Sequence, residues 1–390
     1  MTWQTKKLGE ICEIINGGTP KTNVTKYWDG DILWLTPKDM GKLTSFYVDY
    51  TTRKITESGL KNSSAKLIPI NSVILSSRAP IGYLAINSKP ITTNQGCKGL
   101  TPKHNLNVQF LFYFLKKSTD LLNSLGSGTT FKELSGTVLK EITIPFPPLS
   151  EQQRIVAILD KVFAGIEKTK ENTKKNLQNA KELFESYLQS VFANLGKDWK
   201  EKKLSEVCGI CSKLVDPREL DFLDLRHIGA GNIETNSGQL LNVKTAREEK
   251  LISGKFEFDA TMVLYSKIRP YLMKVAKPDF KGLCSADIYP LKPDKNFLIR
   301  GFLFYLLLTQ TFTDFAVRGS ARAGMPKVNR DHLFNFKFFL PTIFEQKTIV
   351  NNLDNLSAKT KKLEVIYQQK LLDLEELKKS VLKKAFSGEL

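Results

Sequence analysis

PPLSEQQRIVAILD, at Pro147–Asp160, returns as PTIFEQKTIVNNLD at Pro341–Asp354, about half of the 390-residue chain later. Two further segments repeat at a similar offset: WQTKKLGEIC at Trp3–Cys12 returns as WKEKKLSEVC at Trp199–Cys208, and FLFYFL at Phe110–Leu115 returns as FLFYLL at Phe302–Leu307. Between these anchors, residues 17–70 and 213–260 share almost no sequence that can be aligned. A framework copied twice around two unlike inserts is what we expect of a protein that recognises two different things at a fixed separation.

Each copy of the first segment leads into a long helical pattern. From Ser150 the period of the apolar residues changes from two to about three and a half, and Ser150 is expected to cap the helix, with Gln153 at the capping-box position. Roughly 40 helical residues would span about 60 Å at 1.5 Å per residue. The residues expected in the coiled-coil interface are Leu159, Val162, Ile166, Leu183 and Tyr187 in the first helix and Leu353, Leu356, Leu363, Tyr367, Leu374 and Leu377 in the second.

Matching apolar stripes on two helices of equal length predict that the helices pack on each other as a coiled coil. A parallel pair would require the second globular segment to return the chain by the full helix length, whereas an antiparallel pair would not. We therefore expect an antiparallel coiled coil with a globular domain at each end, related by an approximate twofold axis. The polar centre of the first helix, Thr169–Asn176, interrupts its stripe.

The remaining segments are rich in strand patterns. Residues 31–35, 72–75 and 83–86 are short apolar or aromatic runs between turn residues, residues 108–122 predict a helix, and residues 142–146 predict a closing strand. The predicted fold is α+β, with two mixed, strand-rich domains at residues 1–149 and 196–341, separated by two long helices at residues 150–195 and 342–390.

Composition and charge favour a nucleic-acid-binding protein. Hydrophobic residues make up 41% and charged residues 25%, and no apolar run approaches the roughly 18 residues of a membrane span, so a cytoplasmic protein with no membrane partner is expected. An odd number of cysteines, five, favours reduced thiols. Most of the net charge of +18 lies in residues 1–150 and 199–341, which predicts two basic faces for phosphate backbones. A general lysine bias is the alternative, but arginine is also gathered in the second insert.

Catalytic and metal-binding signatures are incomplete in the sequence. GGTPKT at Gly17–Thr22 departs from the Walker spacing, and Pro20 would remove one of the amides that cradle a phosphate. Cys208 and Cys211 have zinc spacing but no second ligand pair follows them. We find no amino-methyltransferase signature and no nucleophile elbow. The sequence therefore predicts a non-catalytic chain that binds no cofactor or metal itself.

Several turns and loops carry side chains suited to DNA. Asparagine and glutamine amides can contact adenine, and arginine and lysine can contact guanine or phosphate. The candidate DNA-binding residues are Lys38, Arg78, Asn94, Gln95, Lys98, Lys132, Arg226, Lys267, Arg269, Arg322, Lys327 and Arg330. The loops at residues 127–132 and 320–330 occupy matching places before the last strand of each domain. The alternatives are turn chemistry for Asn94, a surface ion pair for Arg78 and plain connectors for the loops.

These segments together resemble the specificity subunit of type I restriction-modification systems. The resemblance rests on the repeated segment before each long helix and on TTNQGCKGLTP at residues 92–102, YSKIRPYL at residues 265–272, AGMPKVNRDHL at residues 323–333 and LEELKKSVLKKAFSGEL at residues 374–390. It covers essentially the whole chain. The first half has TTFKELS where the second has AGMPKVNR, so base contacts do not transfer between the halves.

The resemblance implies two target-recognition domains that each read one half of a bipartite, asymmetric site in double-stranded DNA. The helices would set the spacer and dock two modification subunits, which supply S-adenosylmethionine and methylate adenine. Restriction subunits with ATP and magnesium would add translocation and cleavage. Two other functions stay open at this point: an enzyme with a divergent nuclease or methyltransferase centre in one insert, and a coiled-coil adaptor that binds protein. Binding of a cofactor analogue and a salt-dependent DNA shift would separate the three.

Overall fold

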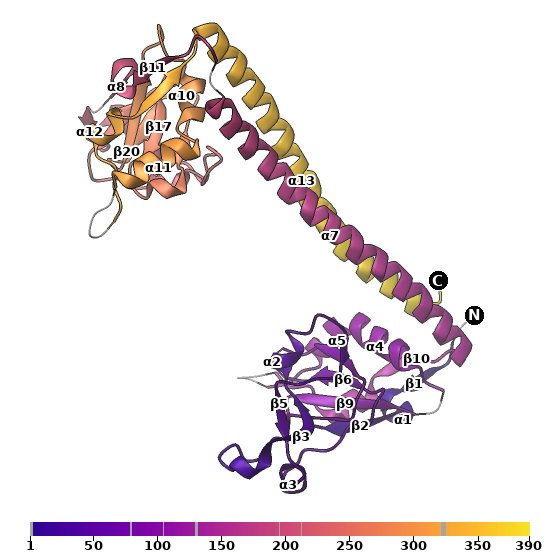
Figure 1. Ribbon diagram of the computed structural model, residues 1–390. Coiled ribbons are helices and arrows are strands. Elements are labelled where there is room, and N and C mark those ends of the chain that lie inside the picture. Colours follow the sequence, from indigo (N-terminus) through magenta and orange to yellow (C-terminus); the bar gives the residue numbers. More distant parts are fainter. Residues whose placement is uncertain are drawn as a thin grey trace. The chain divides into compact units, whose positions relative to one another are not determined.

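The computed structural model describes residues 3–78, 80–103, 105–128, 132–194, 196–211, 213–320 and 325–390. The chain folds as two compact units, which we call unit 1 (Met1–Lys174 with Gln369–Leu390) and unit 2 (Lys175–Gln368). Two long helices, α7 (Leu149–Ala193) and α13 (Ile343–Ser387), each contribute one end to either unit (Figure 1). The predicted α+β class, with two strand-rich parts and a pair of long antiparallel helices, is confirmed.

Unit 1 contains one five-stranded mixed sheet, one three-stranded sheet and one two-stranded ribbon. Its strands are β1 (Thr5–Lys7), β2 (Cys12–Asn16), β3 (Trp28–Leu35), β4 (Tyr47–Val48), β5 (Arg53–Ile55), β6 (Val73–Ser76), β7 (Leu84–Asn87), β8 (Ile91–Thr93), β9 (Cys97–Pro102) and β10 (Thr143–Pro145). Its short helices are α1 (Leu8–Ile11), η1 (Thr25–Tyr27), α2 (Pro37–Met40), α3 (Glu57–Lys61), α4 (Val108–Lys117), α5 (Thr119–Ser124) and α6 (Gly136–Glu141). The strand orders are β2-β9-β6-β7-β4, β5-β3-β8 and β1-β10.

Unit 2 has the corresponding arrangement with different inserts. Its strands are β11 (Lys200–Lys203), β12 (Cys208–Ile210), β13 (Leu214–Val215), β14 (Arg226–Ile228), β15 (Lys244–Thr245), β16 (Lys255–Phe258), β17 (Val263–Ser266), β18 (Val275–Ala276), β19 (Gly282–Cys284), β20 (Ile288–Pro293) and β21 (Lys337–Leu340). Its short helices are α8 (Leu204–Val207), α9 (Leu220–Leu223), η2 (Ala230–Asn232), η3 (Pro270–Leu272), α10 (Arg300–Leu306), α11 (Gln310–Arg318) and α12 (Arg330–Phe334). The strand orders are β12-β20-β17-β18, β13-β16-β19-β14-β15 and β11-β21.

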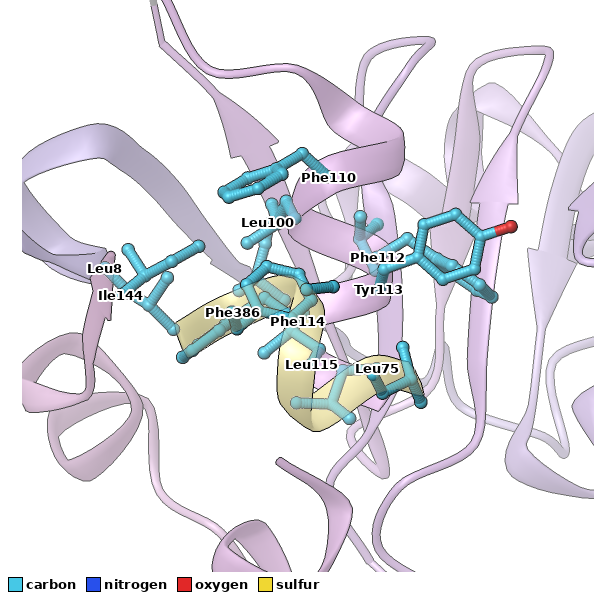
Figure 2. Packing of buried hydrophobic residues seen from close by; sticks show 14 of the residues in the cluster. Leu8, Leu75, Leu100, Phe110, Phe112, Tyr113, Phe114, Leu115, Ile144 and Phe386 are labelled. Carbon is cyan, nitrogen blue, oxygen red and sulfur yellow. The ribbon is translucent and has the colours of Figure 1, made fainter. Parts of the chain in front are cut away.

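The aromatic repeat FLFYFL forms the core of unit 1. Every side chain of this run on α4 is buried, and Phe386 of α13 packs on it, with ring centroids 4.9 Å from Phe110 and 5.6 Å from Phe114 (Figure 2). In unit 2, Phe302 of the second copy packs on Phe192 of α7 at 5.0 Å. Each globular part is therefore joined to one end of the helix pair by a continuous apolar core.

The expected single helix at residues 108–122 is instead two helices. Ser118 ends α4 and precedes α5, with φ −91° and ψ 8°, and the Thr119 hydroxyl donates to the Lys116 carbonyl. Serine and threonine compete with the helical backbone for hydrogen bonds, and here two of them stand together.

The helix cap expected at Ser150 is also corrected, because α7 begins at Leu149 and Ser150 lies inside it. The amides of Glu151 and Gln152 donate to the Pro148 carbonyl, so Pro148 precedes the first turn. In the second copy a threonine does cap: the Thr342 hydroxyl accepts from the Glu345 amide at 3.3 Å, and the Glu345 carboxylate accepts from the Thr342 amide at 3.0 Å.

The helices run antiparallel in the part of the pair that belongs to unit 1. Arg154 donates to the Leu390 carbonyl, Glu167 pairs with Lys378, and Lys170 pairs with Glu375, so residue numbers rise along one helix as they fall along the other. The buried seam positions in unit 1 are Leu159, Ile166 and Thr173 on α7 and Leu374, Leu382 and Ala385 on α13. In unit 2 they are Ala180 and Leu188 on α7 and Leu353 and Thr360 on α13.

Part of the expected interface lies outside this seam. Leu183 is 54% exposed and Leu377 is 46% exposed, and Tyr187 and Leu363 are also exposed, whereas Val162, Leu356 and Tyr367 are half-buried. The seam passes one residue later, through Phe184, Leu188 and Lys378, whose side chain is only 17% exposed. A lysine stem can cover apolar surface while its ammonium reaches a carboxylate, here that of Glu167. The predicted positions Leu159, Ile166, Leu353 and Leu374 are buried in the seam, whereas at Leu183, Tyr187 and Leu377 the choice by apolar type misses it by one residue.

Two buried glutamines anchor the helices to the globular parts in the same way. Gln152 accepts from the Asn107 amide at 2.8 Å and donates to the Asn105 and Pro147 carbonyls, both at 2.9 Å. Gln346 accepts from the Ile299 amide at 2.9 Å and donates to the Phe297 and Pro341 carbonyls at 2.8 and 2.9 Å. Both side chains are fully buried, which explains why the repeated segment keeps this residue.

We expect Gln152→Ala or Gln346→Ala to lower the free energy of unfolding by about 2 to 4 kcal/mol, because each leaves a buried amide and two carbonyls without their partner. Urea denaturation followed by circular dichroism measures the change. Gln153→Ala is the matched control, since Gln153 is exposed, and should stay within about 0.5 kcal/mol of the wild type. Denaturation of both anchor variants at the wild-type midpoint would show that these contacts contribute nothing.

Candidate nucleic-acid interface

The first candidate surface is built around the Asn94-Gln95-Gly96 turn between β8 and β9. The backbone amide of Asn94 donates to the Leu35 carbonyl of β3 at 3.0 Å, and the side-chain oxygen of Asn94 accepts from the backbone amide of Gly96 at 3.1 Å. The turn chemistry considered for Asn94 is thus present. The Gln95 side chain is exposed and accepts from the Thr19 hydroxyl. Both amide groups are held in place by protein contacts while they line an open surface.

The GGTPKT segment supports this turn, which gives its glycines a structural role. The Gly17 amide donates to the Cys97 carbonyl at 3.2 Å, and the Gly18 amide donates to the Thr93 carbonyl at 2.8 Å. A Cβ at Gly17 would lie 1.9 Å from the Asn94 carbonyl oxygen, and one at Gly18 would lie 2.3 Å from the Ala65 nitrogen. The segment approaches so closely that only glycine fits at both positions.

Arg78, Lys98 and Glu133 form a charged network beside the turn. A guanidinium nitrogen of Arg78 lies 2.6 Å from Glu133, and the Lys98 ammonium lies 4.0 Å from the same carboxylate and donates to Asn16 at 3.1 Å. Lys98 is only 5% exposed, and burial lowers its pKa. The structure corrects the prediction of Lys98 as a surface contact: its side chain lies beneath the surface, next to Glu133, which pairs with Arg78.

Four predicted residues of unit 1 share one open cavity of about 680 Å³. Lys38, Arg78, Asn94 and Gln95 line it, and they come from α2, from the turn after β6 and from the turn after β8. Lys132 is exposed beside Glu133 in the neighbouring loop. The cavity also contains two cations that were not predicted, Lys42 and Arg53. Strand β5 carries Arg53 opposite Trp34 of β3, a pairing across 19 positions that local patterns do not reveal.

The second candidate surface lies in unit 2, where two predicted segments meet. The Arg269 amide donates to the Pro326 carbonyl at 2.9 Å, and the Val328 amide donates to the Lys267 carbonyl at 2.8 Å. Arg269 has φ 49° and ψ 60°, a left-handed conformation at this turn, and its side chain is exposed. The strained turn is fixed by the opposite segment, so the basic side chains on both segments lie together.

Positive charge is concentrated on this second surface. Lys327 lies 3.5 Å from Asp287, and the Lys267 ammonium lies 5.0 Å above the Tyr289 ring. Burial and then the charge of Lys327 lower the pKa of Lys267, and Arg330 at the start of α12 acts in the same direction. One carboxylate among these cations leaves an excess of positive charge that suits an anionic ligand.

Two other predicted residues are placed differently. Arg226 is exposed on β14, with its guanidinium 4.9 Å from the Phe280 ring, in the other sheet of unit 2. Arg322 lies outside the described residues, as do parts of the two loops predicted to match. The described ends of those loops do match: the Glu133 amide donates to the Ser127 carbonyl at 2.8 Å, and the Lys327 amide donates to the Ser320 carbonyl at 3.4 Å.

The two surfaces share one backbone framework. In unit 1, backbone amides donate to backbone carbonyls from Asn94 to Leu35, from Ser77 to Gly96 and from Leu134 to Ser77. The equivalent bonds of unit 2 run from the Ser285 amide to the Ile228 carbonyl, from Lys267 to Asp287 and from Val328 to Lys267. Three side chains at equivalent positions differ in character: Ser285 for Asn94, Ile268 for Arg78, and Lys327 for Glu133. The same scaffold therefore presents two different chemical surfaces.

No cluster of three or more histidine, cysteine, aspartate or glutamate residues that could hold a metal ion occurs among the residues that the structure describes. Cys208 is buried and Cys211 is half-buried beside β12. In the same described ranges, no helix is both long and apolar enough to cross a membrane. The described geometry draws attention to two basic surfaces on unlike inserts, the first of which also carries the side-chain amides of Asn94 and Gln95.

The sequence matches the profile of the family described as "Type I restriction modification DNA specificity domain" over residues 1–178 and again over residues 196–371. The MjaIX type I restriction enzyme specificity subunit of Methanocaldococcus jannaschii is 32% identical over 273 residues, which are 64% of this chain and 63% of that protein. The chain thus spans a little under two thirds of that relative. The EcoDI specificity subunit of Escherichia coli is 30% identical over 324 residues, 73% of this chain and 70% of that protein.

Solved structures show the same fold. A chain from a study of complex assembly and conformational transition of the type I R-M system superposes with a TM-score of 0.77 at 20% identity and covers 100% of this chain and 98% of its own. The crystal structure of the HsdS subunit from Thermoanaerobacter tengcongensis gives a TM-score of 0.66 at 20% identity, with 100% and 97% coverage.

Proposed function

Because the chain belongs to the family of type I restriction-modification DNA specificity proteins, we propose that unit 1 and unit 2 each read one half of a bipartite, asymmetric site in double-stranded DNA. The chain would be the part of the complex that provides sequence specificity. Its partners would be two modification subunits, with restriction and translocase subunits added to that complex.

The observation that carries this proposal is the backbone framework repeated under unlike side chains. Three equivalent hydrogen bonds hold the recognition turns in both units, yet Asn94, Arg78 and Glu133 in unit 1 are replaced by Ser285, Ile268 and Lys327 in unit 2. These positions are partly exposed, so the exchange of a cation for an apolar residue and of an acid for a base costs the shared scaffold little stability. Reading two different base sequences does require such an exchange.

The contacts divide by chemistry. Arg78, Asn94 and Gln95 suit base edges in the first half-site, and Lys267, Arg269, Lys327 and Arg330 suit the second, whereas the exposed Lys38, Lys132 and Arg226 suit phosphates. Lys98 is left out of the contact set because it is buried.

Exposed apolar residues on the long helices support docking of protein partners. In unit 1 these are Leu372 and Leu377 of α13, at 62% and 46% exposure, and in unit 2 they are Leu183 of α7 and Val365 and Ile366 of α13. Large apolar side chains left outside the helix seam are typical of surfaces that another helix covers. We propose that the modification subunits dock there and bring S-adenosylmethionine, and that ATP and magnesium belong to the restriction subunit.

The proposal predicts that the chain alone transfers no methyl groups. Purified chain incubated with labelled S-adenosylmethionine and host DNA should stay at the blank, because methyl transfer would need a cofactor site that we assign to the partner. Addition of the modification subunits should give methylated adenines in a two-part motif, which single-molecule sequencing would identify. Methyl transfer by the chain alone that disappears when this chain is mutated would refute the non-catalytic assignment, and a motif without two parts would refute the two-reader assignment.

A further inference from the structure

The cavity of unit 1 contains a guanidinium group that is fixed by two tryptophans. The Arg53 guanidinium carbon lies 3.9 Å from the Trp28 ring centroid and 4.8 Å from that of Trp34. The two rings stand edge to face, 5.0 Å apart at 86°. Stacking of a planar guanidinium on indole faces restricts its rotation and leaves its hydrogen-bond donors at the edge.

The tryptophans are themselves held by the GGTPKT segment, which also supports the Asn94-Gln95-Gly96 turn. The Trp34 indole donates to the Gly18 carbonyl at 3.0 Å, and the Trp28 indole donates to the Lys21 carbonyl at 3.2 Å. Trp34 is 3% exposed, whereas Arg53 is exposed. The arginine and the two tryptophans, which we call the Arg53 clamp, are therefore fixed at the indoles and open at the guanidinium. This arrangement favours binding because little side-chain freedom remains to be lost.

Arg53 has no carboxylate partner in the part of the chain that the structure describes. Other arginines do have one: Arg78 pairs with Glu133, Arg218 with Asp216 and Arg247 with Asp224. An arginine that is exposed, stacked and unpaired keeps its forked pair of donors available for an external acceptor.

We propose that Arg53 reads a guanine of the first half-site by donating two hydrogen bonds to O6 and N7 in the major groove; this inference rests on the proposed function. The two acceptors on that edge lie in one plane and match the guanidinium fork. The same cavity is lined by the Asn94 and Gln95 amides, which suit base edges, and by the exposed, flexible Lys38 and Lys42, which suit phosphates. Because the flexible lysines suit phosphates, the fixed planar guanidinium of Arg53 is assigned to a base.

At the equivalent place, the described residues of unit 2 form no arginine–tryptophan stack. The pairing of Trp34 with Arg53 between β3 and β5 corresponds to that of His227 with Lys244 between β14 and β15. His227 is 7% exposed and bonds to Glu249 at 2.7 Å instead of stacking on a cation. Among the described residues, an arginine stacked on two tryptophans occurs in unit 1, whereas in unit 2 Arg226 stacks on the single ring of Phe280. A specificity-determining residue of one half-site requires such a difference between the two units.

The test uses the full chain in complex with its modification subunits and a duplex that carries the mapped motif. Each guanine of the first half-site is replaced in turn by 7-deazaguanine, which removes N7 but keeps base pairing, and affinity is measured by fluorescence anisotropy. The wild type should lose roughly 10-fold to 100-fold at one guanine. Arg53→Ala should bind the normal duplex about as weakly and lose nothing more at that guanine, with sensitivity at the other positions unchanged.

Two further variants separate the fork from its charge. Arg53→Lys keeps the charge but not the planar pair of donors, so it should lose discrimination at the same guanine. Lys54→Ala removes one positive charge from the adjacent residue, whose side chain points to the opposite face of β5, and should keep full discrimination.

Each other outcome decides against the inference or against its premise. Arg53→Ala that keeps the wild-type response to every deazaguanine would overturn it. A uniform loss on all sequences, with a salt dependence reduced by about one ion, would assign Arg53 to a phosphate and also overturn it. A wild-type complex that prefers no sequence would instead refute the proposed function itself.

Discussion

Replacing Arg269, Lys327 and Arg330 together by alanine should weaken binding to the second half-site by about 100-fold or more, while the first half-site is read as before. Each lost base contact removes about 1 to 3 kcal/mol of discrimination. The three side chains come from two segments of unit 2 that are joined by backbone hydrogen bonds. The second candidate surface therefore loses its side-chain contacts while its backbone stays in place. Affinity for duplexes that carry either half-site alone, at one salt concentration, measures the effect.

Two comparison variants make this result specific. Lys38, Arg78 and Asn94 replaced together should act only on the first half-site. A control variant removes the same number of positive charges from unit 2 by replacing Arg218, Arg247 and Lys281 with alanine. Each of these side chains is exposed and pairs with a carboxylate away from the second surface, namely that of Asp216, Asp224 or Glu257. That variant should change affinity by no more than a general charge effect. If the variants of both candidate surfaces affected the same half-site, the two-reader assignment would be wrong.

The architecture could be predicted because it is encoded in a repeat and in a change of period. The helix that starts after Pro147-Pro148 and its second copy are visible as segments with an apolar period of about three and a half, and the aromatic runs mark equivalent core helices. The register of the helix seam is harder to predict from the sequence. Thr173, Thr360 and Lys378 occupy seam positions because threonine can return its hydroxyl to its own helix and lysine can extend its ammonium outward.

Candidate site residues divide along similar lines. Loops with small residues and interleaved cations were found from composition, and the structure brings Lys267 and Arg269 to Lys327 through the Val328 and Arg269 amides. The burial of Lys98 and the stacking of Arg53 depend on cross-strand neighbours, which a linear pattern does not reveal. Lys98 pairs with Asn16 of β2, and Arg53 stands opposite Trp34 of β3. Sequence alone gives neither register, and a one-residue shift would reverse which face each side chain occupies.

Residues 1–198 expressed alone should form a homodimer that, with modification subunits, specifies a palindromic site made of the first half-site and its inverted copy. This fragment lacks residues 369–390 of unit 1, including Leu374, Leu382 and Phe386, which are buried in its core. Phe110 and Phe114 would be exposed in a monomer. An apolar surface of that kind favours association with any segment that can replace the missing one.

The fragment carries such a segment in its own long helix. In unit 2, Leu188 and Phe192 of α7 pack on the second aromatic copy, as Leu382 and Phe386 of α13 pack on the first. A second copy of α7 in antiparallel orientation would therefore bring its Phe192 to Phe110. The polar centre Thr169–Asn176 would face its own copy, so we expect a weaker association than in the full chain.

Sedimentation velocity measures the assembly, and methylation mapping measures the motif. Phe192→Ala should shift the fragment toward monomer, because it empties the position that Phe386 fills in the full chain, whereas Ser186→Ala, at an exposed position of the same helix, should leave the dimer intact. A well-folded monomer, or a methylated motif that is not an inverted repeat, would contradict the prediction. Either result would mean that the two ends of the helix pair are not interchangeable, although the aromatic cores that they complete are equivalent.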